Sequence, residues 1–291
     1  MNQWRVLALA ARPRTLSCAV VPVLVATALA SSHGTARPLA ALASLIASLM
    51  IQIGTNLVND YADAERGADT AERLGPQRVT QSGLLDARAV KRWAALAFGL
   101  ALLPGAYLVW LGGWPILAAG LLSFASGYAY TAGPYPLGYH GLGDLFVMVF
   151  FGFVATLGAY WVQAGALPPA LWLAAVPVGC LATAILAVNN LRDVPTDVVA
   201  GKRTLAVRLG TGAARAEYVT LLAAAFVAPA LLVALGWARP WALLPLLALP
   251  LAARPLKLVL HASGRPLNEA LAGTARLHLI VGALLAVGLL V

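Results

Sequence analysis

Long apolar segments alternate with short polar segments along the whole chain. A helix that crosses a bilayer needs about 20 mostly apolar residues. The eighth apolar segment is the weakest, because it contains two prolines, Pro245 and Pro250, and reaches Arg254 early. The pattern predicts nine membrane-spanning helices, at residues 15–33, 39–58, 93–112, 114–131, 144–162, 169–189, 217–236, 240–256 and 272–291. We expect a single all-helical integral-membrane domain over residues 1–291.

The composition supports this prediction and argues against a soluble helical protein. The chain is 61% hydrophobic and 11% charged, with a mean hydropathy of +0.82, whereas a soluble domain carries roughly 25% charged residues. Arg5, Arg12 and Arg14 precede the first apolar segment, as in a signal peptide. Because many further spans follow, we expect an uncleaved first helix. Cys18 and Cys180 lie in apolar segments, and we expect both to be small buried side chains without a disulfide.

The net charge of +9 is informative through its placement. With nine spans, all but two of the 20 lysines and arginines fall at the N-terminus, in even-numbered loops or at their edges; Arg37 and Arg239 are the exceptions. Positive charge marks the cytoplasmic face of a membrane protein. We therefore predict a protein of the cytoplasmic membrane, with the N-terminus and the even-numbered loops in the cytoplasm and the C-terminus outside. We expect no nucleic-acid partner.

The carboxylates gather on the same side, although acids contribute little to membrane orientation. One cluster ends the second span, in "NLVNDYADAERGAD" (56–69), and another follows the sixth, in "NNLRDVPTDVVAGKRTLAVRLG" (189–210). Residues three and four apart share a helical face. Asn56, Asp60 and Asp63 would therefore project together. Asn189 and Asp193 repeat the same spacing, and we expect Pro195 to break the sixth helix and leave Asp197 beyond the break.

Four carboxylates that converged without partners would repel one another and protonate. Mg²⁺ prefers oxygen ligands and is usually held by one or two carboxylates together with substrate phosphates and water. Asp60, Asp63, Asp193 and Asp197, with Asn56 and Asn189, therefore fit a site for two Mg²⁺ ions and a diphosphate. Lys202, Arg203 and Arg66 are placed in sequence to hold diphosphate oxygens. Charged loops at membrane ends are often only solvated, but the matched pair of motifs favours a metal–diphosphate site.

The two motifs resemble the aspartate-rich motifs of the UbiA superfamily of intramembrane prenyltransferases. Four further stretches, "ARPRTL" (11–16), "RLGPQRVTQSGLL" (73–85), "YTAGPYPLGYHGLGDLFVMVFFG" (130–152) and "NEALAGTARLHLIVGALLAVGLL" (268–290), resemble its MenA branch, which prenylates 1,4-dihydroxy-2-naphthoate. The resemblance implies nine transmembrane helices around a central cavity with cytoplasmic cap loops. It also implies that Mg²⁺ ligands fall on Asn56, Asp60, Asp63, Asn189, Asp193 and Asp197. Many members carry a further Asp where this chain has Gly67, and Asp69 is a substitute candidate.

The resemblance implies that a polyprenyl diphosphate reacts with 1,4-dihydroxy-2-naphthoate to give demethylmenaquinol, diphosphate and CO₂. The naphthoate carboxylate needs a cationic partner, for which Arg12, Arg14 and Arg78 are candidates. Asp144, at the start of a span, is expected to pair with an arginine or with a substrate hydroxyl. Tyrosines at this end could stabilise an allylic cation or anchor the interface; the candidates are Tyr61, Tyr128, Tyr130, Tyr135 and Tyr139.

Two alternatives stay open at this point. Another UbiA-type enzyme could attach a prenyl or phytyl chain to a different acceptor. A secondary transporter is the alternative from another class, but transporters place substrate sites near the bilayer midplane, and the carboxylates here lie at one end of the spans.

Overall fold

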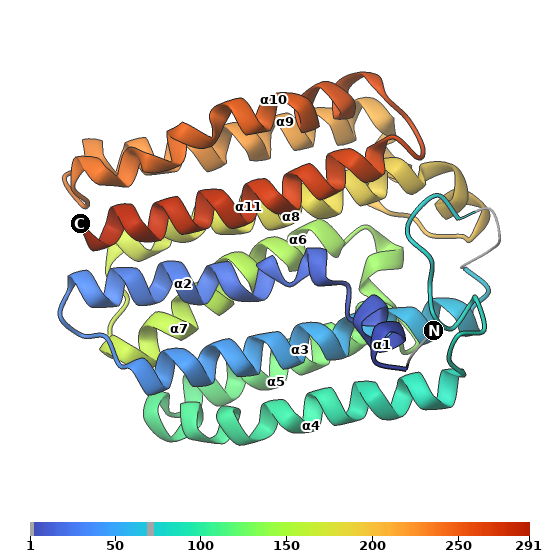
Figure 1. The fold of residues 1–291 in the computed structure, drawn as a ribbon, viewed down its shortest axis with the longest axis horizontal. Coiled ribbons are helices and arrows are strands. Elements are labelled where there is room, and N and C mark those ends of the chain that lie inside the picture. The colour runs from blue at the N-terminus through green and yellow to red at the C-terminus, as the bar shows by residue number, and fades with distance from the viewer. Residues whose placement is uncertain (1–2, 69–72) are drawn as a thin grey trace.

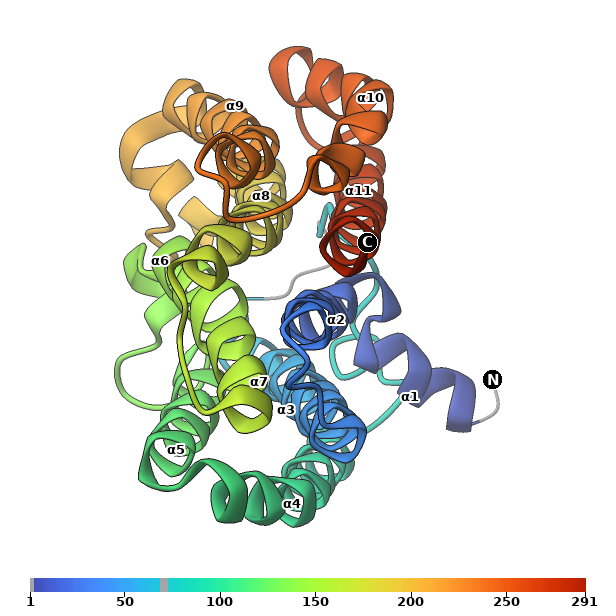
Figure 2. The same cartoon turned by 90° about the vertical axis from the view of Figure 1, so that its left-hand side faces the viewer.

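The computed structural model describes residues 3–68 and 73–291. The long helices lie side by side (Figure 1), and the end-on view in Figure 2 shows them arranged in a ring. The described residues form helices and turns without a strand, which confirms the predicted all-helical fold. The elements are α1 (Gln3–Ala11), η1 (Pro13–Thr15), α2 (Ser17–Ser32), α3 (Pro38–Glu65), α4 (Ala87–Gly112), α5 (Trp114–Ala129), η2 (Leu137–His140), α6 (Gly143–Val147), η3 (Met148–Val154), α7 (Ala155–Ala164), α8 (Pro169–Val199), α9 (Leu205–Ala234), η4 (Pro240–Ala248), α10 (Leu249–His261) and α11 (Leu267–Leu290).

Each predicted span lies mainly within helical segments of the structure, as the apolar pattern predicted. Among the described residues, seven helices are long and apolar enough to cross a membrane, and up to eight if the bent pair Trp4–Thr15 and Ser17–Ser32 counts as one. The 16-residue α5 is apolar but shorter. These helices make the chain an integral membrane protein, while the count of nine spans stays a prediction. The weak eighth segment is a 3-10 helix, η4, that continues into α10.

The loops separate into two ends. The N-terminus and the loops after α3, α5, α8 and α10 lie at one end of the bundle, and the C-terminus lies at the other (Figure 1). Local sequence sets several of these boundaries. Asp86 accepts a hydrogen bond from the Ala89 backbone amide and so caps the start of α4. The arrangement agrees with the predicted alternation of loops; that the N-terminal end faces the cytoplasm stays a prediction.

The predicted break at Pro195 is wrong. Helix α8 continues through Pro195 to Val199, although a proline removes one backbone hydrogen bond and costs about 3 kcal/mol in a helix interior. The long packing of α8 along α9 and α11 offsets this cost (Figure 1). Asp197 consequently lies on the same helix as Asp193, one turn further on, and Asn189, Asp193 and Asp197 share one face.

A π-helical segment, η3, interrupts the helix between α6 and α7. Gly152 of η3 packs directly on Gly179 of α8, since a Cβ built on Gly152 would lie 2.7 Å from the Gly179 Cα. Small residues allow helices in a membrane to approach this closely. The extra residue in the wide turn changes which side chains face inward, and π-segments often accompany functional sites for this reason.

Gly288 on α11 makes a similar close approach that can be tested. A Cβ at Gly288 would lie 2.2 Å from the Trp241 carbonyl oxygen, so Gly288→Ala forces the α11 and η4 backbones apart. We expect a loss of about 1–3 kcal/mol, measured as a lower melting temperature in detergent. Gly99→Ala on exposed α4, where nothing lies within 4 Å, is the control and should be neutral or stabilising. Equal melting temperatures for the two variants would contradict this packing.

Candidate active site

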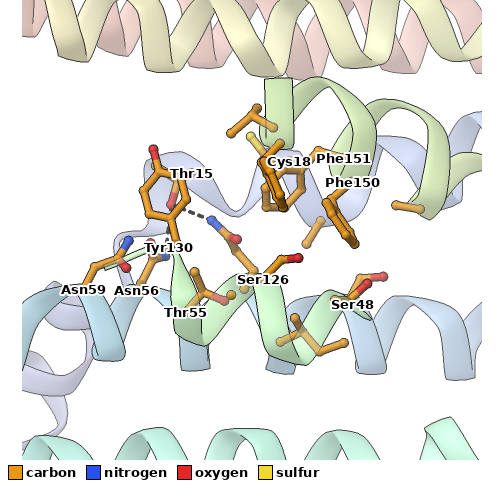
Figure 3. Close-up of a pocket in the computed structure, with 18 of the residues that line it drawn as sticks. Thr15, Cys18, Ser48, Thr55, Asn56, Asn59, Ser126, Tyr130, Phe150 and Phe151 are labelled. Atoms are coloured by element: carbon orange, nitrogen blue, oxygen red, sulfur yellow. Dashed lines mark hydrogen bonds between the residues drawn. The ribbon is translucent and has the colours of Figure 1, made fainter. Parts of the chain in front are cut away.

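The helices surround a cavity of about 810 Å³. Polar side chains such as Asn56, Asn59 and Tyr130 gather at one end, and Phe150 and Phe151 lie further along (Figure 3). The apolar part is lined mainly by small or aliphatic residues of α4 and α5, among them Gly105 and Gly120. The cavity therefore suits an elongated ligand with a polar head and an apolar tail.

Asp63 of α3 is the centre of the polar end. It is 3% exposed, and three loops supply its partners. Arg78 Nη2 lies 3.0 Å from Asp63 Oδ2, Lys202 Nζ lies 3.0 Å from Oδ1, and the Tyr139 hydroxyl donates to Oδ1 at 2.7 Å. One buried carboxylate thus joins the loops after α3, α5 and α8. Two cations beside one carboxylate leave positive charge that an anionic ligand can share.

Asp60 has a different environment from Asp63. The residue is 1% exposed, and its carboxylate accepts hydrogen bonds from the backbone amides of Val79 (3.2 Å) and Thr80 (2.9 Å). It does not line the cavity. In this geometry Asp60 fixes the loop after α3, and its predicted role as a metal ligand stays a prediction.

The second motif faces the cavity along α8. Asn189, Asp193 and Asp197 all line it, as one helical face requires. Arg192 Nε and Nη2 lie 2.8 and 2.5 Å from the two carboxylate oxygens of Asp193, and Nη2 also donates to Asn189 Oδ1 at 2.8 Å. The central expectation from the sequence, that the ends of the second and sixth spans meet at one cavity, is therefore what the structure shows.

Two amides of α3 are oriented by fixed partners. Asn56 Nδ2 donates to the Ala11 carbonyl at 2.9 Å and to Thr15 Oγ1 at 3.1 Å, so its carbonyl oxygen stays available. Asn59 Oδ1 accepts from the Thr131 hydroxyl, so its amide hydrogens point elsewhere. The side-chain amides of Asn56 and Asn59, which both line the cavity, therefore have fixed orientations.

The donor set suits a hard divalent cation. The lining groups of the two motifs are carboxylate and amide oxygens, the ligands that Mg²⁺ prefers. Within residues 3–68 and 73–291, no three His, Cys, Asp or Glu side chains come close enough to form a cage for a metal. Asp63, Asp193 and Asp197 are instead spread around the cavity, an arrangement that fits ions sharing their ligands with phosphate oxygens.

Several predicted site residues lie outside the cavity lining. Arg14 is exposed, and Arg66 donates to the Gly133 carbonyl and covers one face of Tyr139. The Arg203 backbone pairs with Tyr139. Asp144 accepts hydrogen bonds from Asn190 and not from an arginine: Asn190 Nδ2 lies 3.4 Å from each carboxylate oxygen. Asp69 lies outside the described residues. The cavity lining includes these predicted residues: Asn56, Asp63, Arg78, Tyr139, Asn189, Asp193, Asp197 and Lys202.

Other polar lining residues were absent from the predicted site. Asn59 precedes Asp63 by four residues, so its Asn-x-x-x-Asp spacing could have revealed it. Asn190 follows Asn189, and only the tilt of α8 decides that both face the cavity. Arg73 comes from the loop after α3, where spacing gives no signal. Of the tyrosines, Tyr130 and Tyr139 line the cavity, while Tyr61 and Tyr128 line a smaller pocket of about 310 Å³ outside it.

Two ion pairs of α3 differ in burial and allow a matched test. Asp63→Asn leaves Arg78 and Lys202 buried without their carboxylate, so we expect a loss of about 3–5 kcal/mol, read as a lower melting temperature in detergent. Glu65→Gln breaks the Lys91–Glu65 pair, whose side chains are 46% and 47% exposed, and should cost about 0–1 kcal/mol. A melting temperature for Asp63→Asn equal to that of Glu65→Gln would rule out Asp63 as the anchor of the three loops.

Comparisons with known proteins identify the family of the chain. Residues 19–289 match the UbiA prenyltransferase family. The chain is 41% identical over 256 residues to the 1,4-dihydroxy-2-naphthoate octaprenyltransferase of Escherichia coli K12, with 86% of this chain and 83% of that protein covered. It is 42% identical over 244 residues to the enzyme of the same description from Mycobacterium tuberculosis, with 84% and 82% covered.

Solved structures agree with this fold. The apo structure of a UbiA homolog from Aeropyrum pernix has a TM-score of 0.71 at 18% identity, covering 99% of this chain and 98% of that one. A UbiA homolog from Archaeoglobus fulgidus bound to DMAPP and Mg²⁺ has a TM-score of 0.64 at 16% identity, covering 97% and 99%. The chain belongs to the UbiA prenyltransferase family.

Proposed function

We propose that this protein transfers a polyprenyl group from an allylic polyprenyl diphosphate to 1,4-dihydroxy-2-naphthoate, releasing diphosphate and CO₂ and giving demethylmenaquinol for menaquinone biosynthesis. The observation that carries the proposal is the identity of 41–42% to enzymes with this acceptor, over more than four fifths of each chain. The cavity supports it, because a polar end with two acidic motifs continues into an apolar end.

The diphosphate head group of the donor belongs at the polar end. Asp63, Asp193 and Asp197, with the amide oxygen of Asn56, are the residues that would hold Mg²⁺. Bound Mg²⁺ would supply positive charge that stabilises the diphosphate as it leaves. Lys202 and Arg78 lie beside Asp63 and can turn to diphosphate oxygens while keeping that carboxylate as a neighbour. Their positive charge favours breaking of the allylic C–O bond.

The acceptor then attacks the allylic carbon through the ring carbon that bears its carboxylate. The new C–C bond uses a ring electron pair, and loss of CO₂ returns the C–C bonding pair to the ring and restores aromaticity. No strong base is therefore needed to remove a ring proton. Of the arginines considered for the acceptor carboxylate, Arg12 and Arg78 line the cavity, and Arg78 pairs with Asp63. Because Arg78 is assigned to the diphosphate, Arg12 is the candidate for the acceptor carboxylate, and its backbone adopts the left-handed conformation (φ 53°) that non-glycine residues rarely adopt.

The apolar part of the cavity accommodates the isoprenoid chain and keeps water from the reacting carbon. Phe150, Phe151 and Tyr130 present aromatic faces that can stabilise positive charge on the allylic group. A donor with a lipid tail explains why the site lies inside an integral membrane protein. We place the protein in the cytoplasmic membrane with the polar end toward the cytoplasm, because the basic residues gather at that end.

Not every relative in the family has a name that specifies the acceptor. The chain is also 30% identical to the human UbiA prenyltransferase domain-containing protein 1, with 94% of this chain and 80% of that protein covered. A UbiA-type enzyme with a different aromatic acceptor or a phytyl donor stays the alternative from the sequence analysis. A transporter has no support from the family or from the site.

Purified protein in nanodiscs tests the proposal. With farnesyl diphosphate, 1,4-dihydroxy-2-naphthoate and Mg²⁺, we expect a prenylated, decarboxylated product by mass spectrometry. EDTA should abolish it, and Asp193→Asn or Asp197→Asn should reduce the rate at least about 100-fold, since each removes a carboxylate from the site. Glu65→Gln, outside the cavity, serves as the control. Product from 4-hydroxybenzoate but none from the naphthoate would refute the assigned acceptor.

Asp60 allows a separate test of what the first motif does. If Asp60 mainly holds the backbone amides of Val79 and Thr80, Asp60→Asn should lower stability while the Mg²⁺ concentration for half-maximal rate changes less than about threefold. Asp63→Asn in the same titration is the comparison and should raise the Mg²⁺ requirement. A tenfold or larger increase for Asp60→Asn would instead establish Asp60 as a ligand.

A further inference from the structure

Arg192 is a fully buried charge whose role the reaction above does not explain. It is 0% exposed, and all three guanidinium nitrogens have partners on α8 or α11. Nε and Nη2 bind the Asp193 carboxylate, Nη2 also binds Asn189 Oδ1, and Nη1 donates to Asn268 Oδ1 at 2.8 Å. A buried charge is tolerated when it is paired and hydrogen-bonded, and this one makes four hydrogen bonds, two of them to a carboxylate.

Asn268 continues the network from α11 to the loop after α3. Its Nδ2 donates to the Leu74 carbonyl at 2.8 Å. The next residue, Gly75, packs directly on the guanidinium, since a Cβ there would lie 2.6 Å from Arg192 Nη2 and 2.9 Å from Cζ. Gly75 does not have a positive φ, so space and not backbone conformation requires glycine here. Leu74 and Gly75 of this loop are thus held next to the second acidic motif.

Residues 78–80 of the same loop are held by the first motif. Arg78 pairs with Asp63, and the amides of Val79 and Thr80 bind Asp60. We call residues 73–80 the cap segment. It spans from α8 and α11 to α3, and both of its arginines, Arg73 and Arg78, line the cavity. The position of these two cations therefore depends on anchors at both ends of the segment.

We propose that Arg192 is a positioning residue: through Asn268 and Gly75 it holds the start of the cap segment over the cavity while it fixes the orientation of Asp193 and Asn189. One guanidinium thereby couples the second acidic motif to the cations carried by the cap. The inference goes beyond the proposed function by assigning the residues that hold the site together, and its effect on donor affinity rests on that function. Arg192 itself does not line the cavity, so it acts through its neighbours.

Cleavage by trypsin at the Arg73–Leu74 bond reports on this anchor without any substrate. The bond is cut only when the segment leaves its place, since the Leu74 carbonyl is held by Asn268. Asn268→Asp keeps an acceptor for Arg192 but loses the donor to Leu74. We expect cleavage of full-length protein in nanodiscs to become about three- to tenfold faster, the effect of one lost hydrogen bond. Cleavage at Arg66–Gly67, at the end of α3, should stay unchanged and is the internal reference.

Two further variants complete the test. Gly75→Ala keeps every polar partner and adds only a methyl group against the guanidinium, so it should accelerate the same cleavage and serves if Asn268→Asp does not fold. Glu269→Gln, the next residue on α11, loses only its exposed pair with Arg254 and is the matched control. Unchanged cleavage in both test variants, equal acceleration at Arg66–Gly67, or acceleration by Glu269→Gln would overturn the proposal.

Kinetics of the same variants separate this inference from the proposed function. Because the cap segment carries Arg73 and Arg78, Asn268→Asp should raise KM for the prenyl diphosphate about three- to tenfold and leave KM for the naphthoate unchanged. An unchanged KM for the diphosphate, or an equal rise in both KM values, would refute the link from the anchor to donor binding. If cleavage is accelerated but the protein does not prenylate the naphthoate, the role of Arg192 is supported and the proposed function is refuted.

Discussion

The site depends on one buried carboxylate, Asp63, that three loops share. Arg78, Lys202 and Tyr139 come from the loops after α3, α8 and α5, and all converge on its two oxygens. The loop after α3 has further anchors in Asp60 and Asn268, but Asp63 is the residue that joins all three loops. A single negative charge in a partly dry environment attracts both cations strongly. The same cations are thereby gathered where an anionic head group can share them.

The remaining architecture follows from the need to combine this charged end with a lipid-like tail. The π-helical η3 and the close contact between Gly152 and Gly179 turn Phe150 and Phe151 toward the cavity. Arg192 and Asn268 tie α8 and α11 together behind the second motif. The buried charges of Asp63, Asp193 and Arg192 are thus paired, while the part of the cavity along α4 and α5 is mainly apolar. This division suits a reaction in which a diphosphate leaves and water has to be excluded.

Sequence reasoning succeeded where local periodicity carries the information and failed where packing decides. Helical spacing predicted that Asp63 shares a face with Asn56 and that Asp193 shares one with Asn189, and all four line the cavity, because residues three or four positions apart lie on the same side of a helix. The same spacing grouped Asp60 with them, yet its carboxylate turns to the backbone at Val79 and Thr80. Local proline chemistry predicted a break at Pro195, but contacts of α8 with α9 and α11 keep the helix intact. Asn190, Arg73 and Arg192 carry no spacing signal and could not be found in this way.

The sequence by itself determined the membrane character, the helical elements, the division of charge between two ends and the two acidic motifs, because hydropathy and helical period are local properties of the chain. Only the tertiary structure decided which carboxylates face the cavity, that Arg12 rather than Arg14 lines it, and that Arg192 is buried among Asp193, Asn189 and Asn268. The physical reason is that each of these choices depends on helix tilt and on partners far away in the chain. A charged side chain settles where its hydrogen bonds are satisfied, and that place exists only once the helices have packed.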